Sequence, residues 1–322
     1  MLPTSPPLTI RRMGADCHEA RRIQQFQQSL ISWAVPVSAG YTLRGQHSTP
    51  SGKPVLHFIH GNGYCGLVYS PLLALLSLQF DLVLSDMQGH GDTDHGGRFH
   101  GWNRSAESAL EAWQLLAPRF GTAPTFAMGH SFGGVLTALM LAASPRTFRA
   151  AVLLDPVLFT PAIIGVMAVS EPLGLSKLFA LPRQAKRRRR HWPDRAAAGA
   201  QLKGRGMFRG WEDVAFDAYL QHALMPASDG GVTLKCRPSR EAEIFASYPR
   251  RLWQQLGNVR TPVSLLYGDR TFDFVAASAQ SWTAQNGNVQ AFAVAGGHCF
   301  MQEDAATTAQ HVLKFLSAHL ET

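Results

Sequence analysis

Ser131 stands between glycines in the hexapeptide Gly-His-Ser-Phe-Gly-Gly at positions 129–134. An apolar run precedes this hexapeptide and a helix-forming run follows it, which is typical of a nucleophile elbow. In such an elbow a sharp, strained turn lifts the serine hydroxyl above a sheet. Gly129 and Gly133 must be small so that the strand and the helix can approach each other. We therefore predict that Ser131 is a nucleophile.

A serine hydroxyl is a weak nucleophile at neutral pH and needs a general base within hydrogen-bonding reach. His298 lies in the glycine-rich loop 295–300, directly after the last predicted strand. Of the thirteen histidines, it alone combines such a loop position with the chain order serine, acid, histidine. We predict that His298 is this base.

The carboxylate that would orient the imidazole has three candidates. Its usual place is a few residues after the strand that ends at Tyr267, but Thr271 occupies that position. Asp269 comes early and Asp273 comes late for the role. The end of the preceding strand offers Asp155 instead, and Asp155 is our first choice, with Asp273 and Asp269 as alternatives.

Acyl transfer also needs donors for the developing oxyanion. One donor is expected to be the backbone N–H of Phe132, the residue after the nucleophile. The second is expected from the loop 60–63, where the N–H of Asn62 is our choice and that of Gly63 is the alternative.

These residues require a scaffold that brings distant segments to one edge. Apolar, non-alternating runs recur with helices between them, and this rhythm predicts an α/β fold with a mostly parallel central sheet covered by helices on both faces. Residues 30–47 are expected to add one or two antiparallel edge strands. The predicted strands are 54–60, 81–86, 125–128, 150–155, 262–267 and 289–294.

The alternation is interrupted between residues 156 and 256, so we predict a core formed by residues 1–155 and 257–322. The insertion leaves the sheet at its carboxyl edge, where ligands bind in such folds. We interpret it as a helical cap or lid over the site. Residues 156–170 carry no charge, which favours a buried cap helix or an apolar wall for the substrate.

The net charge of +8 is concentrated in one segment. Residues 183–211 hold ten Lys or Arg and one acid, a net charge of +9, while the rest of the chain sums to −1. A nucleic-acid partner is therefore not expected. The run Lys186–Arg190 is interpreted as a solvated helix face, or else as a contact for an anionic group of the substrate or for a membrane surface.

The four cysteines lack the spacing of metal ligands or of a disulfide framework. No stretch of eighteen uncharged apolar residues is present, and the first 22 residues lack the apolar region of a secretion signal. These features favour a cytoplasmic protein with reduced thiols. The sequence does not predict an oligomeric state.

Four motifs together resemble the α/β-hydrolase superfamily: residues 60–63, 86–94, 129–134 and 297–298. The resemblance covers about residues 50–156 and 257–320. It implies a Ser-acid-His triad, no cofactor, no metal, and hydrolysis through an acyl-enzyme.

The expected activity is that of a serine hydrolase, similar to carboxylesterases and lipases, acting on a small-molecule carboxylic ester with an acyl or lipid-like group. The alternatives are an amidase, a thioesterase or a carbon–carbon hydrolase with the same triad. A further alternative is a homologue that binds a ligand without catalysing a reaction.

Overall fold

The computed structural model describes residues 8–320, with side chains described from residue 18 onward. Its centre is an eight-stranded sheet with the spatial order β1-β2-β4-β3-β5-β6-β10-β11. The strands from β4 to β11 run parallel, and the hairpin β1–β2 adds two antiparallel strands at one edge. The bounds are β1 Leu30–Val37, β2 Tyr41–Ser48, β3 Val55–Ile59, β4 Asp81–Asp86, β5 Thr125–His130, β6 Ala150–Leu154, β10 Val263–Gly268 and β11 Val289–Val294. The predicted fold class is confirmed, including the edge hairpin.

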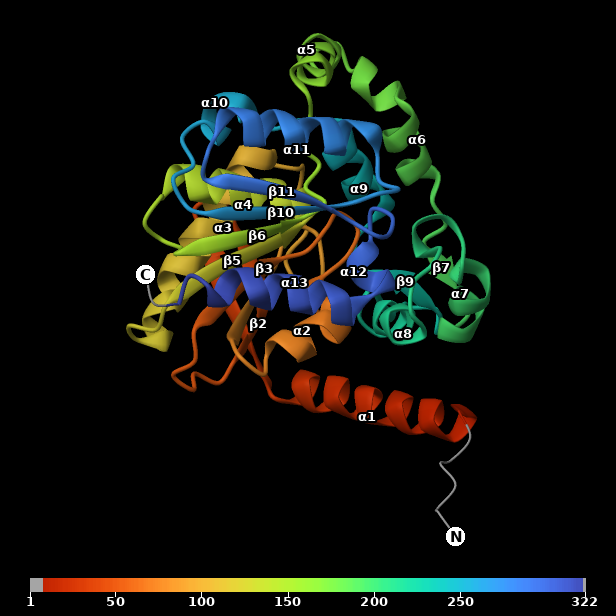
Figure 1. Ribbon diagram of the computed structural model, residues 1–322. Coiled ribbons are helices and arrows are strands. Elements are labelled where there is room, and N and C mark those ends of the chain that lie inside the picture. The colour runs from red at the N-terminus through yellow and green to blue at the C-terminus, as the bar shows by residue number, and fades with distance from the viewer. Residues whose placement is uncertain (1–7, 321–322) are drawn as a thin grey trace.

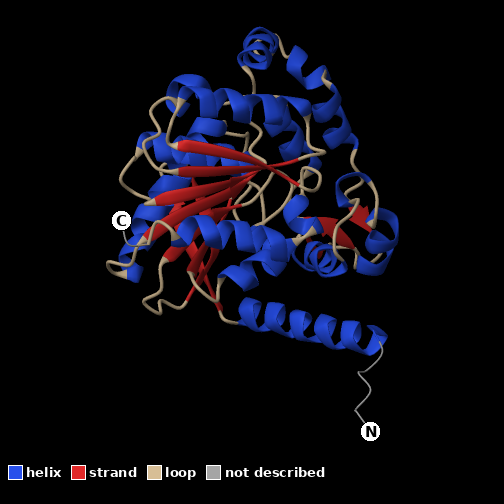
Figure 2. Ribbon diagram, viewed as in Figure 1, coloured by secondary structure: helices blue, strands red, loops and turns tan. Residues whose placement is uncertain are grey.

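Helices cover both faces of this sheet, as Figure 2 shows. The α-helices of the core are α1 Leu8–Gln28, α2 Ser70–Leu76, α3 Trp102–Leu116, α4 Phe132–Ala143, α11 Asp273–Gln285, α12 Phe300–Glu303 and α13 Ala305–Ser317. The short 3-10 helices η1 Gly66–Tyr69 and η2 Ala117–Phe120 precede α2 and follow α3. Helix α1 was not predicted; its inner side packs Ile23 and Phe26 into the core beside α2.

Successive residues of each central strand enter opposite layers of the core. In β3, Leu56 and Phe58 join the layer that contains α2 and α13, whereas Val55 and Ile59 join the layer that contains α3 and α4. The strands are therefore apolar on both faces, which explains why the sequence shows continuous apolar runs in place of alternation.

The strand order reverses around β3, which lies between β4 and β5. The loops that leave neighbouring strands in opposite directions open a crevice at this point of the carboxyl edge. Loops after β3, β5, β6 and β11 carry Asn62, Ser131, Asp155 and His298 respectively, so residues far apart in the sequence meet at this edge.

The segment between β6 and β10 contains more than the helices that we expected. Three short strands form a separate antiparallel sheet in the order β7-β9-β8. Strands of two or three residues are too short to show a period in the sequence. The elements are α5 Pro161–Ser170, η3 Leu175–Leu178, α6 Ala180–Arg187, β7 His191–Trp192, α7 Arg195–Leu202, η4 Gly206–Phe208, α8 Asp213–His222, β8 Leu224–Pro226, β9 Val232–Leu234, α9 Pro238–Phe245 and α10 Leu252–Leu256.

Helix α5 contradicts the expectation of a buried cap helix. Only Met167 and Ser170 of its ten residues are buried, because α5 and α6 stand away from the sheet, as seen at the top of Figure 1. The described part of the chain has no helix with the length and hydropathy that a membrane span requires.

Candidate active site

His298 contacts both of the side chains that we expected it to join. Its Nε2 lies 2.9 Å from Ser131 Oγ, and its Nδ1 lies 2.5 Å from Asp155 Oδ2. The Asp155 side chain is fully buried and that of His298 is 11% exposed. With Nδ1–H donating to the carboxylate, Nε2 is left unprotonated and faces the Ser131 hydroxyl, which is the arrangement that general-base chemistry needs.

The turn at Ser131 is strained and depends on small neighbours. Ser131 has φ of +54°, in the region that residues with a Cβ seldom adopt. A Cβ on Gly129 would lie 2.4 Å from the carbonyl oxygen of Gly133, and one on Gly133 would lie 2.3 Å from that of Ile59. The strand and the helix therefore approach as closely as the elbow motif requires.

Asp155 is held by two donors besides His298. The N–H of Gly268 donates to Oδ1 at 2.8 Å, and the Thr271 hydroxyl donates to Oδ2 at 2.5 Å. The residue at the usual acid position thus supports the carboxylate of the preceding strand. Asp155 has φ of +44°, a second strained non-glycine residue at this edge.

Neither alternative carboxylate forms a hydrogen bond or an ion pair with His298 among the described residues. Asp269 Oδ1 accepts from the N–H of Gly296 at 2.9 Å and lies beside Arg270. Asp273 is exposed in the first turn of α11. The carboxylate that the fold brings to His298 is that of Asp155.

The two candidates for the second oxyanion donor differ in their hydrogen bonds. The N–H of Gly63 donates to His90 Nε2 at 3.0 Å. Because that nitrogen accepts, the imidazole proton is on Nδ1, 3.1 Å from the carbonyl oxygen of Gln88. The N–H of Asn62 forms no hydrogen bond with any group of the described residues. The N–H of Phe132 belongs to the first residue of α4, and N–H groups in the first turn of a helix lack intrahelical partners.

A chain of hydrogen bonds, which the sequence did not reveal, links these loops. The Gly61 N–H donates to the Tyr69 hydroxyl oxygen at 3.1 Å, and that hydroxyl donates to His130 Nδ1 at 2.6 Å. His130 Nε2 then donates to the carbonyl oxygen of His298 at 3.0 Å. Burial, together with the nearby His298, lowers the pKa of His130 well below its ordinary value. A neutral imidazole of fixed tautomer therefore links the loop of residues 60–63, the turn at Ser131 and the loop that carries His298.

A cavity of about 460 Å³ opens onto Ser131 and His298. Its wall is mostly apolar and includes Trp102, Phe159, Phe208, Ile244 and Phe272, and its charged members are one ion pair and Arg205. Part of the uncharged segment that follows β6 does line this wall, through Val157 and Phe159, although α5 itself does not.

That ion pair joins Arg188 and Glu241. Arg188 donates to Glu241 Oε1 at 2.7 Å and to the hydroxyl of Tyr219 at 2.5 Å. Burial raises the pKa of Glu241, and Arg188 opposes the rise. Glu241 also accepts through its carbonyl oxygen from Asn62 Nδ2 at 3.2 Å. Arg188 is thus linked through Glu241 to the loop of residues 60–63, and the run Lys186–Arg190 is not a single solvated helix face.

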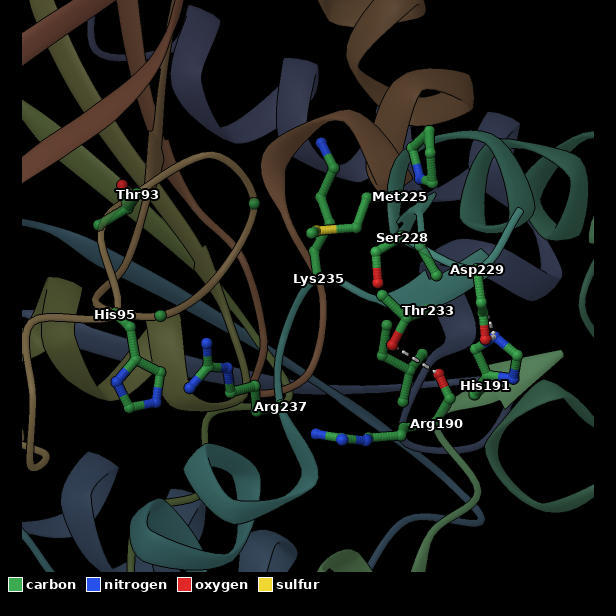
Figure 3. A pocket seen from close by; sticks show the side chains of 15 residues that line it. Thr93, His95, Arg190, His191, Met225, Ser228, Asp229, Thr233, Lys235 and Arg237 are labelled. Carbon is green, nitrogen blue, oxygen red and sulfur yellow. Dashed lines mark hydrogen bonds and ion pairs between the residues drawn. The ribbon is translucent and has the colours of Figure 1, made fainter. Parts of the chain in front are cut away.

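Another cavity, of about 730 Å³, contains neither Ser131 nor His298. Figure 3 shows the side chain of Arg190 extending towards Arg237 in this groove, with Lys235 on the same lining segment. Lys235 pairs with Asp92 at 2.7 Å. In the described residues no group of three or more His, Cys, Asp or Glu side chains is arranged to hold a metal ion.

Solved structures of hydrolases share this fold. E-2-(acetamidomethylene)succinate hydrolase superposes with a TM-score of 0.72 at 22% identity, covering 89% of this chain and 99% of that one. The thioesterase domain from the curacin biosynthetic pathway gives 0.69 at 20% identity, covering 88% and 99%. An esterase of Mycobacterium tuberculosis gives 0.64 at 16% identity, covering 93% and 97%.

A curated relative, the lipase LipV of Mycobacterium tuberculosis, is 33% identical over 114 residues. That match covers 35% of this chain and only 41% of the length of the relative. The model of the alpha/beta hydrolase family, in contrast, matches residues 58–311. By this match, which spans most of the sequence, the chain belongs to the alpha/beta hydrolase family.

Proposed function

We propose that this protein is a serine hydrolase that cleaves carboxylic esters of apolar acyl groups through an acyl-enzyme on Ser131. One observation carries the proposal: a single imidazole lies 2.9 Å from the Ser131 hydroxyl and 2.5 Å from a fully buried carboxylate. Membership of the hydrolase family and the esterases and lipases among the similar proteins support the same reading.

In the proposed reaction His298 Nε2 takes the proton of Ser131 as Oγ attacks the ester carbonyl carbon. The carbonyl oxygen becomes an oxyanion between the N–H groups of Asn62 and Phe132. The imidazolium then protonates the leaving alkoxide, and the acyl group stays on Oγ. A water, deprotonated by the same nitrogen, attacks the acyl-enzyme and releases the carboxylic acid, which restores the Ser131 hydroxyl. Asp155 stabilises the imidazolium at both stages.

The cavity favours a neutral, apolar acyl group. Aromatic and aliphatic side chains make up most of its wall, and such sites bind by burying apolar surface. The charge of Arg188 is already compensated by Glu241, and the other cation of the lining, Arg205, is exposed to solvent. An anionic substituent would therefore gain little from either cation.

The test uses p-nitrophenyl esters of graded acyl length together with a fluorophosphonate probe. Wild type is expected to be labelled at Ser131 and to prefer medium acyl chains over acetate, and Ser131→Ala should lower kcat by about 10⁶-fold. Equal activity in both proteins would overturn the proposal. A wild-type protein that binds an ester without labelling or turnover would indicate a ligand-binding homologue.

The bond type is tested with a matched ester, thioester and anilide of one acyl group. We expect kcat/KM to be highest for the ester, and a preference for either of the others would redirect the proposal to a thioesterase or an amidase.

A further inference from the structure

The segment of residues 161–187, named here the arm, exposes an unusual number of large apolar side chains. Fourteen such side chains are exposed among the described residues, and half of them lie in the arm: Val166, Val169, Leu173, Leu175, Leu178, Phe179 and Leu181. Helix α5 is apolar around its whole circumference, a composition that is ordinarily buried. A cluster of this kind marks a surface that binds something.

Positive charge surrounds these apolar side chains. Lys177, Arg183, Lys186 and Arg187 are exposed on the arm, and the only acid of the arm, Glu171, is paired with Arg250 at 2.7 Å. The exposed charge is therefore entirely basic, and the ligand that complements it combines apolar groups with negative charge.

The arm also borders the entrance of the active-site cavity. Leu181 is both 44% exposed and part of the cavity lining, and so are Met207 and Phe272, at 42% and 37%. Exposed apolar side chains therefore occur both on the arm and at the entrance of the cavity. A ligand bound to the arm would lie next to this entrance. Figure 1 shows α5 at the outer end of the molecule and α6 running from it towards α9, against which α6 packs. The exposed side chains of α5 and of the outer side of α6 can therefore be approached from outside.

We propose that the arm docks on the surface of an anionic lipid bilayer. The apolar side chains would enter the boundary between headgroups and acyl chains, and the basic side chains would face the lipid phosphates. A second copy of this chain fits less well, because a twofold contact through the arm would bring the same four cations against one another. Docking would direct the cavity mouth to the membrane, a consequence that rests on the proposed function; the docking itself does not.

The experiment measures co-sedimentation of the full chain with vesicles of phosphatidylcholine containing a fraction of phosphatidylglycerol, and with phosphatidylcholine alone. The Ser131→Ala background prevents hydrolysis of lipid, so the result is independent of the proposed function. We expect binding to the anionic vesicles that weakens as salt rises.

The apolar contribution is tested with the triple variant Val166→Ser, Val169→Ser and Leu173→Ser. Its partition onto vesicles should fall by at least about tenfold, because three inserted side chains are lost. The matched control is Leu78→Ser, Leu115→Ser and Phe292→Ser, whose side chains are similarly exposed outside the arm; it should bind like the background protein.

The electrostatic contribution is tested with Lys177→Glu and Arg183→Glu, matched by Arg146→Glu and Arg260→Glu. Both control arginines are exposed and lie in the loops that lead into the first residues of β6 and β10, at the opposite edge of the sheet. Thermal unfolding, and activity on a soluble ester when Ser131 is restored, verify that each variant folds. The proposal is overturned if the Ser131→Ala protein does not bind anionic vesicles, or if the arm variants and the control variants bind these vesicles equally. It is also overturned if the apolar variant instead changes a dimer mass in solution without affecting vesicle binding.

Discussion

Asp155 occupies a position that decides how the imidazole of His298 is held. Its carboxylate receives hydrogen bonds from Gly268, Thr271 and His298, so an amide in its place would lose the charge and present a donor to Nδ1. Asp155→Asn is expected to lower kcat by about 10⁴-fold while leaving the fold intact, because the wrong imidazole tautomer would face Ser131. Steady-state hydrolysis of the preferred ester measures this effect.

The controls for that substitution are the two other aspartates near the last strands. Asp269→Asn and Asp273→Asn should each keep kcat within about threefold of wild type, since neither carboxylate contacts His298. A loss of activity in either control comparable to that of Asp155→Asn would refute this assignment.

The ion pair between Arg188 and Glu241 is expected to stabilise the fold. Arg188→Met would leave the Glu241 carboxylate buried at 7% exposure without its cation, and removal of one partner of such a pair costs about 3 kcal/mol of unfolding free energy. The double variant Arg188→Met and Glu241→Gln should recover a large part of this loss. Denaturant unfolding of wild type, both single variants and the double variant measures the coupling; additive losses would mean that the pair is not coupled.

The residues that could be predicted from the sequence are those whose signals are local. Ser131 lies in a six-residue motif and His298 in a glycine-rich loop, and both could be chosen without knowing the fold. Asp155 required the topology, because only a sheet that places β6 beside β10 brings it under Thr271. Tyr69 and Glu241 had no local signal at all: each acts through a partner that lies 61 or 53 residues away along the chain.

The Tyr69 hydroxyl connects two loops of the site through hydrogen bonds to Gly61 and His130. Tyr69→Phe keeps the ring but removes both hydrogen bonds, to the N–H of Gly61 and to His130. We expect kcat to fall by about tenfold with little change in KM, because the loop of residues 60–63 and the loop of His298 lose their common support while the cavity wall is unchanged. The matched control is Tyr41→Phe, a buried tyrosine of the edge hairpin, which should leave kcat unchanged; equal effects of the two variants would exclude a positioning role for Tyr69.

The environment of the uncharged segment 156–170 could not be predicted from its sequence. An uncharged run of residues such as 156–170 indicates contact with something apolar, but it does not say whether that is the core, a substrate or another surface. In the structure Val157 and Phe159 line the cavity, whereas Val166 and Val169 are exposed. One part of this uncharged run therefore lines the cavity and another part is exposed to solvent. Only the tertiary structure distinguishes the two parts.

Several imidazoles in the described part of the chain are held neutral by burial. Burial lowers the pKa of His57 to about 3 and those of His60 and His222 to about 4. It also lowers the pKa values of His90 and His130 well below the ordinary value. In the folded state these five imidazoles stay neutral under mildly acidic conditions, whereas in the unfolded chain they become protonated near pH 6.5.

Between the ordinary and the lowered pKa values the unfolded state binds more protons, so the free energy of unfolding must decrease as the pH falls. Asp86 acts in the opposite direction: burial raises its pKa to about 6, and below that pH the folded state gains one proton that the unfolded carboxylate binds only at lower pH. Burial also raises the pKa values of Glu212 and Glu241, which act in the same direction as Asp86, and it lowers the pKa of a sixth imidazole, His95. Six imidazoles against three carboxyl groups give a net loss of stability on acidification.

We therefore expect urea unfolding at constant ionic strength to show a steep fall in stability between about pH 6.5 and about pH 5. His57→Gln should make that slope shallower by up to about 1.4 kcal/mol per pH unit, the contribution of one proton, because its side chain no longer titrates. Stability that stays constant or rises over this range would contradict the neutral burial of these histidines.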